Sequence, residues 1–129
     1  MRTPVEIETI MQRRRKVAGY LRFIEKTEFD ITTWECGTTA CAVGHMCRAE
    51  IDGWEMFDEL DETGEKHAVP YWDGHASFDA VQAYFGLTLM QASRVFGGVE
   101  AADNYNVPNV RKITPEMVAD MLLSLPPPV

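Results

Sequence analysis

Residues 54–72 read WEMFDELDETGEKHAVPYW, and their structure decides whether this chain folds into helices alone. The stretch MFDEL is compatible with one more helical turn. It is equally compatible with one arm of a β-hairpin that turns at Thr63-Gly64 and returns through HAVPYW, because turn residues between two such stretches are typical of hairpins. The sequence leaves both interpretations open.

The segments on either side of this stretch favour helices. Thr3 and Glu6 have the spacing of a capping box, and the apolar residues that follow predict a helix from about Pro4 to Lys26. Thr38 or Thr39 can cap a second helix that ends at about Ile51. Three more helices are predicted at residues 78–85 after Ser77, at 89–96 after a Thr88/Gln91 capping box, and at 115–125 after Thr114.

These elements predict a mainly α fold, a single-domain bundle of about five helices over residues 1–125 with a short hairpin at 54–72 as the open alternative. The chain of 129 residues is long enough for one apolar core, and its 46% apolar and 25% charged residues are typical of a globular domain. The proline run at residues 126–129 cannot continue a helix and is predicted to be a frayed tail.

The chain shows no signal-peptide pattern and no long apolar run, which predicts a cytoplasmic protein without a membrane partner. Its three cysteines lie within twelve positions, between Cys36 and Cys47. An odd number of such closely spaced cysteines is a poor disulfide framework, so we expect free thiols.

The charges are unevenly distributed along the sequence. The net charge is −8, and residues 50–65 contain eight carboxylates and no basic side chain. Such a run is usually a solvated loop, but it can also form a docking surface for a basic partner, including mimicry of a phosphate backbone. The basic cluster Arg13 to Lys16 is expected to be a solvated face, and alone it is a weak basis for direct nucleic acid binding. The candidate docking residues are Glu55, Asp58, Glu59, Asp61 and Glu62.

Residues 35–50, ECGTTACAVGHMCRAE, hold all three cysteines and one of the three histidines. Cys41 would lie close to a helix N-terminus, where the helix dipole lowers a thiol pKa and favours a nucleophilic thiolate. His45 lies one turn later on the same face, and His67 or His75 would be better placed to act as a base. The sequence therefore keeps a cysteine-dependent enzyme open.

Zinc binding is a second hypothesis for the same stretch. Cys36, Cys41 and His45 could supply three ligands, with His67 or His75 as the fourth. The spacing matches no standard zinc finger.

Packing is the interpretation that we favour for this stretch, with no metal or other cofactor. Free cysteine behaves as a small apolar side chain, so residues 40–47 would form a helix that neighbours approach closely. Gly37 would supply a tight bend and Thr38 a cap, while Gly44 would allow an aromatic residue such as Trp34 to press against the helix.

The stretch HAVPYWDGHASF places Trp72, Asp73 and His75 in a predicted loop. Loops with aromatic and imidazole groups are common linings of binding sites, so these residues are candidates for contact with a ligand or partner.

The segments FDITTW, CGTTACAVGH, FGLTLMQASRVFG and ITPEMVADMLLSL together resemble a group of small bacterial and phage proteins with a Trp closely followed by C-G-T-x-A-C-x-x-G. The resemblance covers residues 29–125. It implies a phage or prophage accessory setting and supplies no catalytic residue, and members of the group often carry Trp at the position of His45.

We therefore expect a small acidic binding protein, a phage accessory or counter-defence factor. Its partner would be a protein or a small ligand, and self-association into a homo-oligomer stays open. The competing class is an enzyme that uses Cys41.

Overall fold

The computed structural model describes residues 2–30, 41–97, 103–109 and 112–128. Five α-helices are bounded within them: α1 (Pro4–Leu21), α2 (Ala42–Arg48), α3 (Ser77–Phe85), α4 (Leu89–Phe96) and α6 (Pro115–Ser124). Three strands form β1 (Glu55–Leu60), β2 (Lys66–Trp72) and β3 (His75–Ala76). Two 3₁₀ turns, η1 (Lys26–Glu28) and η2 (Ile51–Gly53), lie between these elements.

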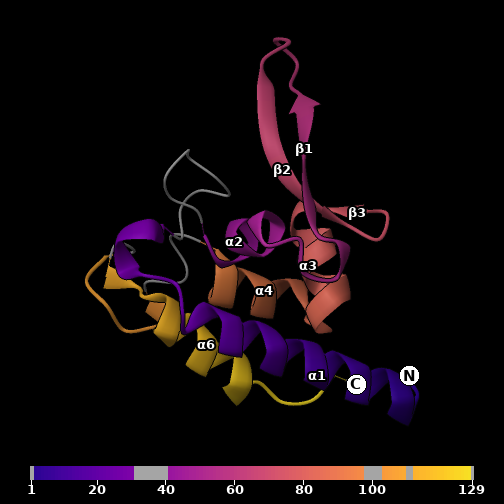
Figure 1. Ribbon diagram of the computed structural model, residues 1–129, viewed down its shortest axis with the longest axis vertical. Coiled ribbons are helices and arrows are strands. Elements are labelled where there is room, and N and C mark those ends of the chain that lie inside the picture. The colour runs from indigo at the N-terminus through magenta and orange to yellow at the C-terminus, as the bar shows by residue number, and fades with distance from the viewer. Residues whose placement is uncertain (1, 31–40, 98–102, 110–111, 129) are drawn as a thin grey trace.

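The fold is mixed α/β, so the prediction of a mainly α bundle is wrong. Strands β1, β2 and β3 form an antiparallel sheet in that order. Of the two interpretations of residues 54–72, the hairpin is correct. Figure 1 shows this hairpin projecting from the helical body along the long axis of the molecule.

A second, shorter hairpin joins β2 to β3 through Asp73 and Gly74. Both residues have positive φ, +48° and +82°, and the flanking pairs are Tyr71 with Ala76 and Trp72 with His75. Asp-Gly suits such a two-residue turn because both positions tolerate left-handed backbone. The predicted loop at this segment is therefore a tight turn.

The bounds of helix α1 were predicted better than those of helix α2. The Thr3 hydroxyl accepts a hydrogen bond from the amide of Glu6, which confirms the start of α1, but this helix ends at Leu21 rather than at Lys26. Helix α2 begins only at Ala42, with Cys41 as its N-cap, and ends at Arg48. The prediction of a helix from Thr38 or Thr39 to Ile51 was therefore too long.

The three later helices form close to the predicted positions, but the caps are confirmed only for α4 and α6. Helix α3 begins at Ser77 itself, with Ala76 as its N-cap and no side-chain capping bond. Thr88 and Gln91 make both bonds of a capping box at the start of α4, and the Thr114 hydroxyl accepts from the amide of Met117 at the start of α6. Gly86 ends α3 with φ +64°, where a Cβ would also lie within 2.9 Å of the Ile10 side chain. Helix α6 ends at Ser124, one residue before the predicted end.

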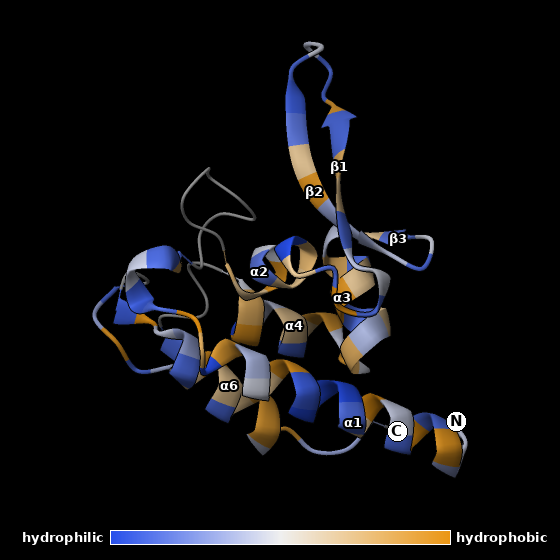
Figure 2. Cartoon of the chain, in the orientation of Figure 1, coloured by the Kyte–Doolittle hydropathy of each residue, from blue (hydrophilic) through white to orange (hydrophobic). Residues whose placement is uncertain are grey.

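The core lies where the apolar faces of the helices meet the base of the hairpin. Helices α1 and α6 pack side by side, and α3 and α4 lie against them. Each of these helices carries hydrophobic residues among polar ones (Figure 2), and the hydrophobic ones supply most of the buried core. The largest fully buried apolar side chains are Leu21, Met46, Trp54, Tyr84, Phe85 and Leu122.

Arg14 is buried although it belongs to the basic cluster that the sequence suggested to be solvated. Only 1% of the residue is exposed, and its guanidinium donates to the carbonyls of Phe85 at 2.9 Å, Gly86 at 3.2 Å and Pro126 at 2.8 Å. Pro128 is buried as well. The Pro126 carbonyl thus contacts α1 and Pro128 lies beside Gly86 at the end of α3, while Pro126 and Pro127 are otherwise exposed.

None of the helices in the described part of the chain has the length and apolar character needed to cross a membrane.

Candidate functional site

The base of the projecting hairpin is fixed by an aromatic cluster. Trp54, the residue before β1, is fully buried. Its ring stacks on Trp72 of β2 with centroids 6.2 Å apart and meets Tyr84 of α3 edge-on at 5.4 Å. Because Trp54 and Trp72 lie at the same end of the two strands, this cluster anchors both arms of the hairpin to α3.

Polar contacts around Asp52 reinforce this anchor. Its carboxylate accepts hydrogen bonds from Lys16 and from the Tyr84 hydroxyl, both at 2.6 Å, and its carbonyl accepts from the Trp72 indole at 3.0 Å. The Lys16 and Tyr84 bonds lower the pKa of the Asp52 carboxyl, whereas burial raises the pKa of Tyr84. The Arg13 guanidinium lies 4.9 Å from the Trp72 ring and 5.0 Å from the Tyr84 ring. Helix α1 thus contributes to holding the hairpin in place.

The register of the hairpin defines two faces. Directly opposed residues of an antiparallel pair place their side chains on the same face. Met56 and Pro70 oppose each other; Met56 packs against the core and Pro70 is buried, so their face turns toward the helical body. The opposite face, here called the outer face, carries the pairs Glu55–Tyr71, Phe57–Val69 and Glu59–His67.

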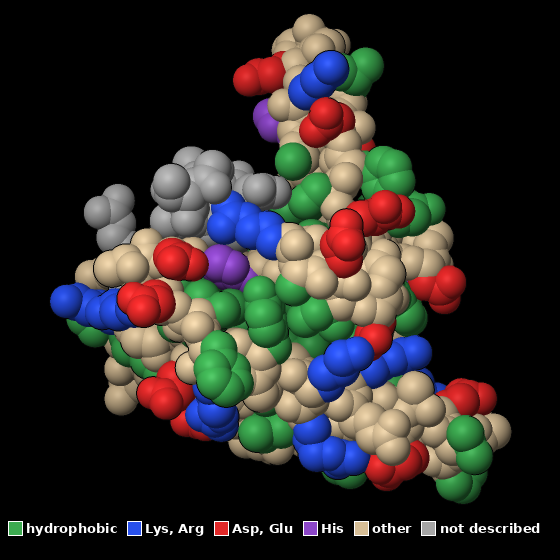
Figure 3. Space-filling model, viewed as in Figure 1, with side chains coloured by type: hydrophobic (Ala, Val, Ile, Leu, Met, Phe, Trp, Pro, Cys, Tyr) green, Lys and Arg blue, Asp and Glu red, His purple; other side chains and the backbone are tan. Residues whose placement is uncertain are grey.

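The outer face presents aromatic side chains between carboxylates. The rings of Phe57 and Tyr71 meet edge-on with centroids 4.9 Å apart, and 47% of Phe57 is exposed. Glu55 and Glu59 are exposed and form no ion pair with any described residue. Figure 3 shows hydrophobic and acidic side chains next to one another on the projecting hairpin. The outer face thus combines exposed apolar and acidic side chains.

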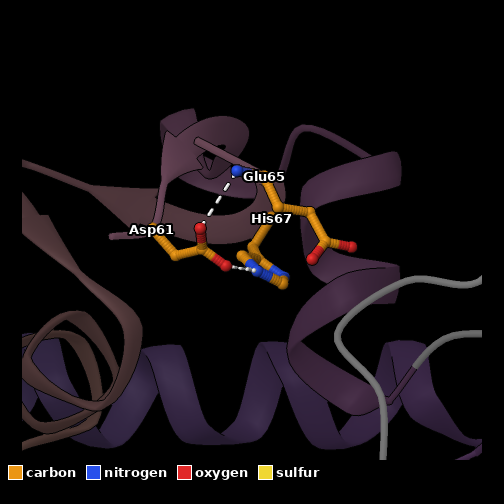
Figure 4. A group of neighbouring side chains, drawn as sticks. All are labelled: Asp61, Glu65 and His67. Carbon is orange, nitrogen blue, oxygen red and sulfur yellow. Dashed lines mark hydrogen bonds and ion pairs between the residues drawn. The ribbon is translucent and has the colours of Figure 1, made fainter. Parts of the chain in front are cut away.

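The tip of the hairpin is held by the Asp61 carboxylate (Figure 4). One oxygen accepts from the Thr63 amide at 2.9 Å, the Thr63 hydroxyl at 2.6 Å and the Glu65 amide at 3.0 Å. The other oxygen lies 2.8 Å from Nε2 of His67. These bonds, with the Thr63 side chain first, lower the pKa of Asp61 to about 2. Asp61 therefore has a structural role in the turn.

The depressed pKa of Asp61 predicts a local effect of acid on the turn. Because the folded-state pKa lies below the ordinary value of 3.8, the carboxylate stabilises the turn above about pH 4, and this stabilisation is lost as the pH falls toward 2. We expect the Thr63 and Glu65 amide resonances to titrate with a midpoint near 2. Asp61→Asn should remove that titration, whereas Glu62→Gln, at an exposed neighbour, should leave it; a midpoint near 3.8 in the unaltered protein would contradict the assignment.

The same tip offers three potential metal ligands, but they differ from the predicted zinc set. The ligand atoms of Asp61, Glu65 and His67 lie within 4.8 Å of one another. All three residues are exposed, and both oxygens of Asp61 already have partners, Thr63 in the turn and Nε2 of His67. Within the described residues, Cys41 and His45 belong to no group of three potential ligands, and Cys36 lies outside them. The structure therefore provides no support for the zinc hypothesis.

The reactive-cysteine geometry is not assembled either. Cys41 is 2% exposed, and burial raises the pKa of its thiol to about 11, so the predicted lowering is wrong. The helix amides act in the expected direction, and the Gly44 amide donates to the sulfur at 3.4 Å, but desolvation outweighs them. His45 is buried with Nε2 2.7 Å from the Glu28 carbonyl oxygen, and His75 is exposed on β3.

Burial of Cys41 predicts slow alkylation. Iodoacetamide at neutral pH should modify Cys41 only at the rate at which the region opens, and urea below the unfolding midpoint should accelerate it. Mass spectrometry of the alkylated peptides measures this rate, with a glycine-flanked cysteine peptide as the reference for a free thiol. Alkylation of the folded protein as fast as that reference would contradict the buried environment.

The described part of the cysteine-rich stretch is buried, as the packing interpretation expects. Residues 42–47 of α2 are all buried, Gly44 among them, and Val43 and Met46 are completely inaccessible. Four residues of the predicted motif, Trp34, Cys36, Gly37 and Thr38, lie outside the described residues.

The other predicted binding residues divide between structural and surface positions. Trp72 belongs to the anchor, and Asp73 occupies a left-handed turn position. Asp58 and Glu62 are exposed on the hairpin. Sequence reasoning did not select Phe57 and Tyr71, because EMFDEL does not alternate apolar and acidic residues and so gives no sign of which side chains share a face.

The helical body offers a less convincing small-molecule site. An open depression of about 580 Å³ is bordered by Met90, Arg94, Asp103 and Asn104. Arg94 and Asp103 are exposed rather than buried. Sites for small ligands usually enclose the ligand around a few converging polar groups, and this open depression has no such enclosure.

Comparison of the chain with protein-family models, with curated proteins and with solved structures found no match in any of the three.

Proposed function

We propose that the protein is a binding factor that captures another protein through the outer face of hairpin β1–β2. The observation that carries the proposal is the ring pair of exposed Phe57 and half-buried Tyr71, framed by Glu55 and Glu59 on an anchored hairpin that projects from the body. Aromatic side chains supply much of the binding energy in protein interfaces when a polar rim surrounds them.

Anchoring of the hairpin base supports this proposal. An element that is already ordered before binding loses less conformational entropy when it meets its partner. The Trp54–Trp72–Tyr84 cluster and the Asp52 contacts hold the two strands before any partner arrives. The strands that carry Phe57 and Tyr71 are thus already anchored to the helical body.

An enzyme based on Cys41 has little to support it, because the thiol is buried and His75 is exposed on the remote β3. The cytoplasmic compartment and the phage accessory or counter-defence setting are part of the proposal, the latter carried by the resemblance of the sequence motifs. Whether the captured protein is a second copy of this chain is an outcome of the experiment below.

A pull-down from cell lysate, quantified by mass spectrometry, tests the proposal. Phe57→Ser should reduce the affinity for the captured protein about tenfold or more, because it removes a central aromatic contact. Phe23→Ser is the matched control, since Phe23 is 88% exposed on the helical body. Equal capture by both variants, at equal melting temperatures, would contradict a role for the outer face.

A further inference from the structure

We infer that the outer face recognises a cationic protein segment, with a lysine or arginine side chain lying over the Phe57–Tyr71 rings between Glu55 and Glu59. The inference rests on the proposed function and specifies the chemistry of the partner.

The spacing of the side chains fits a cation of this kind. Glu55 and Glu59 lie two residues before and after Phe57 on β1, so all three share one face, and each carboxylate begins about 7 Å along the strand from the ring. An aromatic surface attracts a cationic group, and a carboxylate within reach of the same group adds a charge-assisted hydrogen bond. A long basic side chain laid along the strand can satisfy both at once.

The charge balance distinguishes between partner classes. The chain carries a net charge of −8, and residues 50–65 contribute eight carboxylates and no base. A nucleic acid or an acidic protein would be repelled at this surface, and a purely apolar partner would bury Glu55 and Glu59 without compensation. A basic partner gains from both the long-range attraction and the local pairing.

The protein uses the same combination of groups within its own fold. The Arg13 guanidinium lies within 5.0 Å of the centroids of Trp72 and Tyr84. Asp52, which accepts a hydrogen bond from Tyr84, is close enough to interact electrostatically with Arg13. A cation thus lies beside aromatic rings and a carboxylate at the base of this hairpin. Among the described residues, no lysine or arginine is paired with Glu55 or Glu59, and His67 lies opposite Glu59 on the outer face.

Three ten-residue peptides provide the test: alternating arginine and threonine, the same peptide with glutamine for arginine, and the same with glutamate for arginine. Each is titrated into the full chain at low salt and followed by NMR. The arginine peptide should shift the Phe57 and Tyr71 resonances, and its affinity should fall as salt is raised. The double variant Glu55→Gln/Glu59→Gln should bind it about three- to tenfold more weakly than the unaltered protein. The control Glu25→Gln/Glu116→Gln removes the same charge from exposed positions on the body and should bind it as the unaltered protein does.

Several results would overturn the inference. Equal affinity for the glutamine peptide, equal weakening by both double variants, or resonance shifts confined to the helical body would each exclude specific recognition of a cation at this face. When one of these results is found and Phe57→Ser nevertheless reduces capture in the pull-down, the proposed function stands and the outer face binds a partner of other chemistry. If Phe57→Ser leaves capture intact, the proposed function itself fails.

Discussion

Arg14→Ala is expected to lower the free energy of unfolding by about 3 kcal/mol, the upper end of the cost of leaving buried hydrogen-bond acceptors unsatisfied. Its guanidinium joins the end of α3 to the C-terminal segment through the carbonyls of Phe85, Gly86 and Pro126. Removal of the side chain leaves these acceptors without their donor and opens a cavity beside α1. Burial lowers the pKa of Arg14, but a guanidinium stays protonated in proteins, so these three carbonyls serve as the hydrogen-bond acceptors of a buried charge.

Two further variants define the role of Arg14. Arg14→Lys should recover only part of the lost stability, since a single ammonium group cannot reproduce the planar arrangement of donors. Arg15→Ala is the matched control, because Arg15 is exposed and its ion pair with Glu8 contributes at most about 1 kcal/mol. Urea denaturation of the four proteins gives the comparison. Similar losses for Arg14→Ala and Arg15→Ala would show that the Arg14 contacts do not hold the C-terminal segment.

Trp54→Ala is expected to cost about 3–5 kcal/mol, as truncation of a large buried aromatic side chain usually does. Trp54 is completely inaccessible and contacts both Trp72 and Tyr84, so its loss removes the common support of β1 and β2. Hydrogen exchange should report that β1 and β2 open more often than α1 and α6 in this variant. Uniform acceleration in the whole protein would mean that the hairpin and the helices unfold together.

Trp54→Phe should cost less than about half as much as Trp54→Ala. The indole nitrogen of Trp54 is buried without an acceptor among the described residues, so the phenylalanine ring removes an unpaired donor while retaining much of the apolar contact. Trp72→Phe serves as the comparison, because it loses a hydrogen bond to the Asp52 carbonyl at 3.0 Å. Equal losses for Trp54→Phe and Trp54→Ala would contradict this explanation.

The local signals in the sequence were sufficient for most helix boundaries. Thr3, Thr88 and Thr114 cap the helices that they were predicted to cap, because a hydroxyl that accepts from an amide three residues later is a purely local interaction. The end of α2 was not predictable in this way. Glu50 and Asp52 adopt left-handed backbone, φ +53° and +49°, although neither is glycine. These strained positions turn the chain into the hairpin.

The sequence indicated the hairpin as one of two possibilities but gave no reason to prefer it over a helical turn. EMFDEL fits one helical turn as well as one strand, and the acidic residues do not discriminate between them. Its conformation is decided by tertiary contacts: Trp54 and Met56 pack on the core, and Asp61 closes the turn. The two-residue turn before β3 was predictable, because Asp73-Gly74 is a dipeptide typical of such hairpin turns.

Burial accounts for the main differences between the sequence predictions and the structure at the candidate site. Cys41 lies at a helix start as expected, although α2 begins later, but its environment raises the thiol pKa where the dipole alone would lower it. Arg14 is buried although its neighbours in the basic cluster suggested a solvated face. The acidic run was recognised, whereas the aromatic pair that it frames depends on the register of two strands.

The central claim is that the protein works through the outer face of the hairpin and that the cysteine-rich helix is packing. Hydrogen exchange of the protein with and without the partner captured in the pull-down tests it most directly. Exchange should slow in residues 55–60 and 66–72, while residues 42–48 of α2 keep the same rates. Slower exchange confined to α2, with the hairpin unaffected, would contradict the account.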